Sequence, residues 1–170
     1  SMQSLTSYAV KENDKRIFYE IAWLISTELR AVGIDLNFAP VLDIDESKSS
    51  IIGDRAFSKN VKEVIEFSSL YIDGMHEAGM KSTGKHFPGH GGVYEDSHLE
   101  LVEDQRSLED LLHEDIKPYS ELKDKLDVIM CAHVLFPEVD KKLPSYSKIW
   151  LEDILSCLLY TSPSPRDNSG

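Results

Sequence analysis

A repeated unit of helix, glycine, strand and polar loop is the feature that most limits how this chain can fold. The expected strands start near Ile34, Met80 and Asp127, so the repeat is about 46 residues long. Two of the junctions share a pattern, "RAVGIDLNFAP" and "HEAGMKSTGKHFP". Strand, helix and strand in succession form a right-handed crossover between parallel strands. The repeat therefore predicts an α/β fold with three parallel strands at its core.

Apolar side chains at helical spacing predict the helices between these strands. Asn13 or Asp14 is expected to cap the first helix, which runs to about Ala31 and is ended by Gly33. Three more helices are expected over about 59–78, 108–125 and 147–159. The strands are expected over about 34–39, 81–87 and 127–133.

Charge and composition exclude several classes of partner. The net charge is −12, so neither a nucleic-acid backbone nor an anionic membrane surface is an expected partner. No apolar run approaches the roughly 20 residues of a membrane span. Cys131 and Cys157 have no metal-binding spacing and are a poor basis for a disulfide framework, which favours a cytoplasmic setting. Residues 160–170, "YTSPSPRDNSG", form a polar tail that is expected to be disordered or foreign to the fold.

The unusual polar residues follow the expected strands, in "DIDESKSSIIGDR", "PGHGGVYEDSH" and "AHVLFPEVD". Parallel α/β folds place their active sites at that edge of the sheet. The segment from Gly84 to His98, "GKHFPGHGGVYEDSH", contains three histidines, two carboxylates and four glycines. We expect its glycines to leave the part over 89–98 mobile or poorly packed. The segment is the first candidate for a functional site.

Three hypotheses account for this loop. In the first, Asp96 orients His98 for proton transfer, while Lys85, His86 and Arg55 bind substrate. In the second, a metal ion is bound by a set of side chains on the loop, namely His86, His90, His98 and Asp96. In the third, the histidines only cap and hydrogen-bond a polar loop. The gathering of three histidines at the functional edge of a βα repeat favours a function over the third hypothesis.

Other polar residues at this edge leave their roles open. Four follow or lie in the first expected strand and fit either ligand contacts or turn formation: Asp35, Asn37, Asp43 and Asp45. Arg55 is suited to forked hydrogen bonds with hydroxyls or a carboxylate, or to a surface ion pair with Asp54. His133 is expected to be a buried, hydrogen-bonded core histidine.

Together, these stretches resemble the family 3 glycoside hydrolases, and in particular their bacterial β-N-acetylglucosaminidase (β-hexosaminidase) branch. The resemblance spans about 17–155 and is carried by "GIDLNFAPVLDI", "GDRAFS", "YIDGMHEAGMKSTGKHFPGHG", "DSH" and "LDVIMCAHV". It implies that residues 1–159 are an incomplete TIM-type (β/α)8 barrel domain, containing about strands three to five with their helices.

The resemblance also implies a reaction and residue roles. Asp96 and His98 would be the acid/base pair, and Arg55, Lys85 and His86 would bind N-acetylglucosamine. The implied reaction is retaining removal of a terminal, non-reducing β-linked N-acetylglucosamine. The implied substrates are peptidoglycan fragments (muropeptides) that are recycled in the cytoplasm. No cofactor and no metal are implied, and the whole protein would be a monomer.

One part of this chemistry is not recognisable in the chain. A retaining mechanism needs a nucleophilic carboxylate opposite the acid/base. The family takes it from a later strand, where this chain reads "SCLLYTSPSPRDNSG". We therefore expect the 170-residue chain to be inactive. Because a partial barrel has open edges, we also expect it to be marginally stable or to self-associate. The alternative is a non-catalytic sugar-binding or metal-binding domain that uses the histidine-rich loop.

Overall fold

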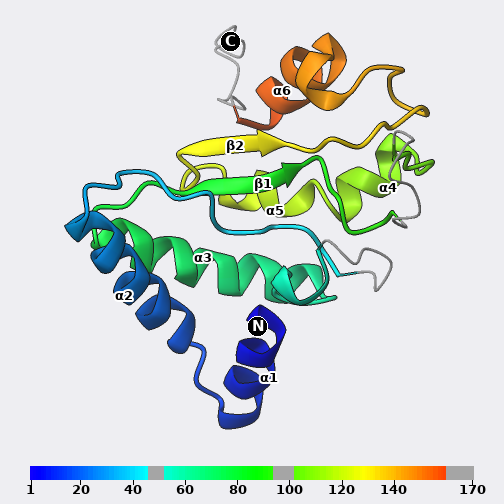
Figure 1. Cartoon of the computed structure of the whole chain (residues 1–170). Helices are drawn as coiled ribbons and strands as arrows, with labels where there is room; N and C mark the ends of the chain where they lie inside the picture. The colour runs from blue at the N-terminus through cyan, green and yellow to red at the C-terminus, as the bar shows by residue number, and fades with distance from the viewer. Residues whose placement is uncertain (46–51, 94–101, 160–170) are drawn as a thin grey trace, which may run out of the picture.

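A computed structural model describes residues 1–45, 52–93 and 102–159 (Figure 1). Its longer helices are α1 (Met2–Glu12), α2 (Ile17–Ala31) and α3 (Val61–Glu77). The two strands are β1 (Thr83–Phe87) and β2 (Val128–Cys131). Shorter helical elements are η1 (Gly53–Arg55), α4 (Leu108–His113), α5 (Lys117–Leu122), η2 (Pro144–Tyr146), the π-helix η3 (Ile149–Leu155) and α6 (Ser156–Leu159).

The predicted parallel pairing is confirmed for β1 and β2, which align Thr83 with Val128 and Lys85 with Met130. The expected strand over 34–39 is not a regular strand. It is an extended segment that makes two isolated parallel bridges to the β1 side, Leu36 with Lys81 and Val41 with Lys85. Pro40 lies between these bridges and has no N–H to donate, so the hydrogen-bond ladder cannot run through it.

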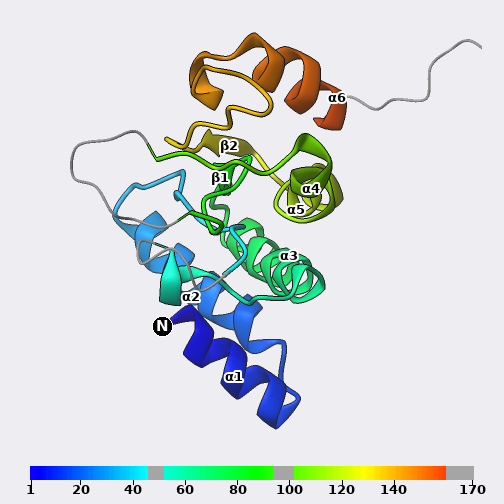
Figure 2. The same ribbon diagram turned by 90° about the vertical axis from the view of Figure 1, so that its right-hand side faces the viewer.

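The helices pack around the outside of this small sheet in chain order. α2 contacts α3, α3 contacts α5, and α5 contacts α6. Figures 1 and 2 show α3, α2 and α1 on one side of the strands and η3 with α6 on the other. Within the described residues, no helix is both long enough and apolar enough to cross a membrane.

Each of the four predicted helical regions contains helix, but some of the predicted boundaries are wrong. Asn13 does not cap α2; it ends α1 in the left-handed conformation (φ 52°), which asparagine tolerates well. The helix expected over 108–125 is broken into α4 and α5. Pro118 lies in the first turn of α5, where a missing N–H is harmless, whereas the ring would clash with a continuous helix before it. The sequence therefore contained the signal for this break.

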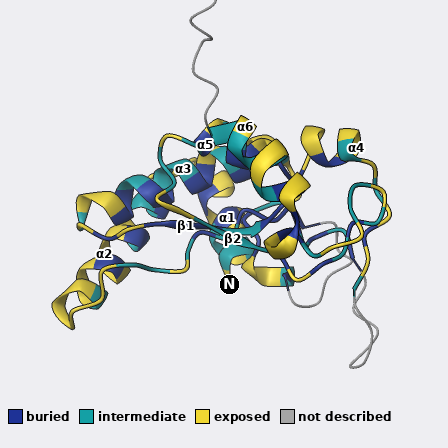
Figure 3. Cartoon of the chain, turned by 90° about the horizontal axis from the view of Figure 1, so that it is seen from above, coloured by how far each residue is buried: buried dark blue, intermediate teal, exposed yellow. Residues whose placement is uncertain are grey.

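Two clusters of buried side chains hold the layers together. One joins α2 and α3 through Phe18, Phe57 and Phe67, where the rings of Phe18 and Phe67 stack at 4.5 Å. The other lies between β1, α5 and η3, where Phe87 packs edge-to-face on Tyr119 and Trp150. Figure 3 shows the exposed residues along α2, on the side away from the strands. Full burial of such aromatic side chains contributes about 1.5–3 kcal/mol each.

Candidate active site

Three described segments meet near the carboxyl end of β1: residues 39–45, residues 53–57 and the turn 88–93 that follows the strand. The extended segment reaches this edge because Leu42 donates its N–H to the Lys85 carbonyl at 2.7 Å. Residues 53–57 reach it through α1, since the Thr6 hydroxyl donates to the Phe57 carbonyl at 2.7 Å. The polar residues that follow different strands are thus brought to one edge, as parallel strands require.

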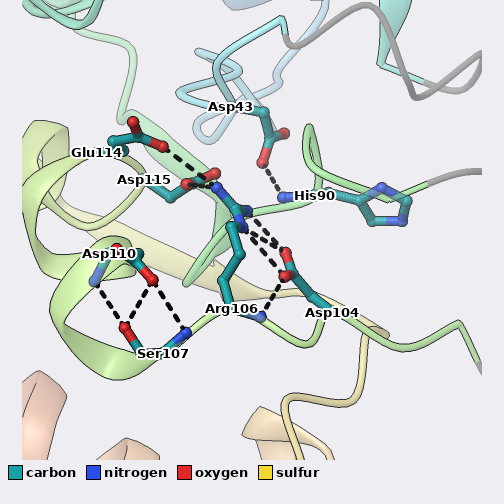
Figure 4. Close-up of polar contacts among 8 residues, drawn as sticks. All are labelled: Asp43, His90, Asp104, Arg106, Ser107, Asp110, Glu114 and Asp115. Carbon is teal, nitrogen blue, oxygen red and sulfur yellow. Dashed lines mark hydrogen bonds and ion pairs between the residues drawn. The ribbon is translucent and has the colours of Figure 1, made fainter. Parts of the chain in front are cut away.

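Asp43 is the most enclosed charged side chain of this edge, with no exposed side-chain surface. Its Oδ2 lies 2.7 Å from Nδ1 of His86. Its Oδ1 accepts from the backbone N–H of His90 at 2.9 Å, as Figure 4 shows, and from that of His86 at 3.3 Å. A buried carboxylate needs such partners to offset its lost hydration. The contacts join the first segment to the end of β1 and to the turn after it.

His86 and His90 lie beside each other above this carboxylate. Their ring centroids are 5.8 Å apart, with the planes at 63°. His86 is 17% exposed, so its ring is enclosed but still reachable. The buried Nδ1 of His90 has no hydrogen-bond partner among the described residues.

Arg55 and Lys85 line one pocket of about 350 Å³. Its other walls come from residues 39–41, from Phe57 and Tyr71, and from the start of α1. Burial lowers the pKa of the Lys85 ammonium below its ordinary value, and the charge of Arg55 lowers it further, whereas Asp43 acts in the opposite direction. Asp54 lines the pocket as well. The pocket thus combines two cationic groups and one carboxylate with an apolar wall, which suits a polar ligand that also carries a small apolar group.

The expectation of a loosely packed loop over 89–98 is wrong for residues 89–93, and residues 94–98 lie outside the described part of the chain. Pro88, Gly89 and Gly91 are buried. A Cβ on Gly91 would overlap the carbonyl oxygen of Ile44, and one on Gly89 would overlap the carboxylate of Asp115. The glycines therefore permit close packing against neighbouring segments rather than motion.

A buried ion-pair cluster supports this turn from the other side, and sequence reasoning missed it. Arg106 donates from Nη2 to Asp104 and from Nη1 to Asp115, each at 2.7 Å (Figure 4). Burial alone would lower the pKa of Arg106, but the hydrogen bonds and negative charges of Asp104 and Asp115 raise it above its usual range. A Cβ on Gly92 would overlap this guanidinium group. In the sequence, this cluster is visible only as three charged residues, Asp104, Arg106 and Asp115, whose spacing follows no periodic pattern.

The predicted site residues fall into three groups. Arg55, Lys85 and His86 come together at the edge described above. Asp96 and His98 lie outside the described residues, and so does the rest of 94–101. His133 is exposed, so its predicted role as a buried core histidine is wrong. It lies two residues after β2 and is the exposed residue between two buried neighbours, Ala132 and Val134.

The remaining candidates take structural partners. Asp35 pairs with Arg30, and Asp45 accepts from the Gln3 side chain at 2.7 Å. Among the described residues, no group of three or more histidine, cysteine, aspartate or glutamate side chains could hold a metal ion. The metal hypothesis also requires Asp96 and His98, so it stays a hypothesis.

Comparisons with known proteins match nearly the whole described chain. The family model "Glycosyl hydrolase family 3 N terminal domain" matches residues 1–158. A beta-hexosaminidase of Idiomarina loihiensis is 48% identical over 155 residues, which are 91% of this chain and 47% of that protein. A beta-hexosaminidase of Pseudomonas aeruginosa is 42% identical over 154 residues, 91% of this chain and 46% of that protein. The chain spans about half the length of the curated relatives it matches.

Solved structures of NagZ from Neisseria gonorrhoeae have a similar fold. The native protein superposes with a TM-score of 0.88 at 40% identity, covering 92% of this chain and 47% of that one. The same protein in complex with N-trifluoroacetyl-D-glucosamine gives a TM-score of 0.87 at 40% identity, with the same coverage of both chains. Its complex with a zinc ion gives 0.87 at 39% identity, again with that coverage.

Proposed function

Because this α/β chain belongs to the glycosyl hydrolase family 3 N-terminal domain family, we propose that the whole protein is a retaining exo-β-N-acetylglucosaminidase. Its reaction is the removal of a terminal, non-reducing β-linked N-acetylglucosamine from peptidoglycan fragments in the cytoplasm. The 170-residue chain corresponds to about strands three to five of a TIM-type barrel in this proposal, with residues 160–170 outside the domain. The whole protein is a monomer that needs no cofactor.

The shared pocket of Arg55 and Lys85, beside a His86 that Asp43 holds, is the observation that carries this proposal. Cationic donors bind sugar hydroxyls and carbonyl groups by charge-assisted hydrogen bonds. The apolar wall at Phe57 and Tyr71 suits an acetyl methyl group. A relative that was solved with N-trifluoroacetyl-D-glucosamine supports an N-acylated sugar as the ligand class.

Asp96 and His98 are proposed as the acid/base pair. The carboxylate accepts from one ring nitrogen, which fixes the tautomer, and the other nitrogen passes the proton to the leaving group. Asp43 is a poor candidate for the nucleophile, because it is fully buried and already accepts from His86 and His90. Asp140 is likewise engaged, since it accepts from the Ser147 hydroxyl at 2.5 Å. The resemblance to the family implies that the nucleophile comes from a later segment of the whole protein, and these two engagements are consistent with that.

Hydrolysis of a chromogenic β-N-acetylglucosaminide tests the proposal. The 170-residue chain is expected to show no enzymatic turnover, and the whole gene product is expected to be active. In the whole protein, His98→Ala should slow an alkyl glycoside far more than a nitrophenyl one, because only the poor leaving group needs the proton. Equal losses with both substrates would remove His98 from the acid role, and rapid turnover by the 170-residue chain would contradict the absence of its nucleophile.

A second candidate is a non-catalytic domain that binds zinc. It is favoured by the adjacent rings of His86 and His90 and by the relative solved with a zinc ion. Calorimetric titration of the chain with zinc separates the two candidates. We expect no tight binding; sub-micromolar binding that disappears in His86→Ala would favour the metal function.

A further inference from the structure

We infer that Asp43 is a positioning residue for the candidate sugar site. Its carboxylate holds His86 in one tautomer and connects the turn 88–93 to the end of β1. The effect of Asp43 on sugar binding rests on the proposed function. Its effect on the tautomer of His86 can be tested without any sugar. Both oxygens of this fully buried carboxylate form hydrogen bonds. Oδ2 contacts the His86 ring, and Oδ1 contacts the backbone of the turn at His90.

The first consequence concerns the imidazole of His86. A carboxylate can only accept, so the 2.7 Å contact with Oδ2 requires a proton on Nδ1 of His86. In the neutral ring the other nitrogen, Nε2, then carries a lone pair and accepts from a ligand. A ring free to turn would present either nitrogen and either tautomer. Asp43 thus decides which hydrogen-bonding group His86 offers.

The second consequence concerns the backbone. Oδ1 accepts from the N–H groups of His86 and His90, at 3.3 and 2.9 Å, so it bridges the end of the strand and the turn. The residue after Asp43 completes the contact, because the Ile44 carbonyl lies against Gly91 at a distance that leaves no room for a Cβ. Residues 43–44 therefore fix the position of the turn through these contacts. Lys85 lies on the same strand and forms the parallel bridge with Val41, two residues before Asp43, so its position depends on the same segment.

Asp43→Asn provides a sharp test, because asparagine has the same shape and one different hydrogen-bonding group. Its carbonyl can keep accepting from the two backbone N–H groups, which turns its NH₂ toward Nδ1 of His86. Nδ1 must then accept, and the ring proton moves to Nε2. The variant is expected to invert the tautomer of His86 without removing the side chain's volume.

The measurement is the ¹⁵N spectrum of the imidazole rings in the 170-residue chain, recorded at alkaline pH where the rings are neutral. Wild type is expected to show His86 protonated at Nδ1, and Asp43→Asn at Nε2. Asp45→Asn is the matched control, since this neighbouring buried carboxylate contacts Gln3 and Lys59 and, among the described residues, neither His86 nor His90; it should keep the wild-type pattern. A wild-type ring protonated at Nε2, or the same change in both variants, would overturn the inference even if Asp43→Asn folds poorly.

A titration with N-acetylglucosamine connects this result to the site. The affinity is expected to fall at least about fivefold in Asp43→Asn and to stay unchanged in Asp45→Asn. If the tautomer inverts while wild type binds no sugar, the proposed function fails and the positioning role stands. If wild type binds the sugar and the tautomer does not invert, the positioning role fails and the proposed function stands.

Discussion

A histidine–aspartate pair lies at each end of the two strands, and the pairs differ in burial and in surroundings. At the amino end, His76 lies 2.9 Å from Asp127, and the two side chains are 38% and 30% exposed. At the carboxyl end, His86 lies 2.7 Å from Asp43, and the side chains are 17% and 0% exposed. The same two residue types therefore occur in an open setting and in an enclosed one.

The amino-end pair connects elements of the fold. His76 belongs to the last turn of α3, Ser82 immediately precedes β1 and Asp127 immediately precedes β2. Asp127 accepts from the backbone N–H of Ser82 at 2.9 Å and from its hydroxyl at 3.2 Å. No cationic lysine or arginine group is recorded as a partner of this pair among the described residues. Its contacts all serve to fix where the two strands begin.

The carboxyl-end pair lies instead beside groups that can bind a ligand. Lys85 precedes His86 and shares a pocket with Arg55. In parallel α/β folds, the loops after the strands carry the site, whereas residues before the strands contribute to stability. Burial and charged neighbours, and not the pairing of histidine with aspartate, therefore distinguish the end of the sheet that carries the proposed site.

The largest effect on stability is expected from Gly91→Ala at the carboxyl end. The new Cβ would overlap the Ile44 carbonyl, which is backbone and cannot turn aside, so the free energy of unfolding should fall by about 2–3 kcal/mol. Urea denaturation of both chains measures this difference.

Gly92→Ala is the matched control for that change. Its Cβ would meet the Arg106 guanidinium, which can shift only at the expense of its hydrogen bonds with Asp104 and Asp115. The Ile44 carbonyl cannot shift without moving the backbone, so the loss should be smaller in Gly92→Ala than in Gly91→Ala. Equal stability of Gly91→Ala and wild type would show that the turn 88–93 is not packed as described.

A smaller effect is expected from Asp127→Ala at the amino end. It removes the acceptor for Ser82 and His76, and should lower the free energy of unfolding by about 1–2 kcal/mol. Asp124→Ala, an exposed carboxylate three residues earlier, should change it by less than about 0.5 kcal/mol. If Asp127→Ala were as harmless as this control, the amino-end pair would have no role in stability.

The smallest expected effect is the pH dependence of the contribution that Asp127 makes to the free energy of unfolding. Burial alone would raise the pKa of Asp127, but hydrogen bonds from Ser82 and His76 outweigh it and lower the pKa. A lowered pKa in the folded state means that the stabilisation is fully present above the unfolded pKa of about 3.9 and is lost as the pH falls through the folded value. The difference between wild type and Asp127→Ala should therefore shrink below about pH 4. A difference that grows on acidification would contradict this sign.

The sequence predicted the helices and the parallel pairing because both leave a local signal. Periodic apolar residues located α2 and α3, and Gly33 and Gly79 follow these helices with positive φ angles of 86° and 74°. α1 was missed, since its apolar residues are few and weakly periodic. The break before α5 was missed although Pro118 is visible in the sequence.

The geometry of the site was less predictable, because it depends on long-range contacts. The sequence alone is compatible with a ligand role or a turn role for Asp43, and the choice depends on His86 and His90, which lie 43 and 47 residues away. The glycines of the loop predict motion when only the sequence is considered. Their actual role depends on Ile44 and Asp115, whose approach no local pattern reveals.

An NMR titration of the ¹⁵N-labelled chain tests most directly the proposal that the carboxyl end of β1 binds N-acetylglucosamine through Arg55, Lys85 and His86. We expect the backbone signals of 41–45, 53–57 and 85–90 to shift with sugar, while those of Ser82 and Asp127 stay in place. Lys85→Ala should weaken binding about tenfold or more, equal to about 1.4 kcal/mol, and Asp127→Ala should bind as wild type does. Shifts centred on the amino end, or equal binding by Lys85→Ala and wild type, would contradict the account.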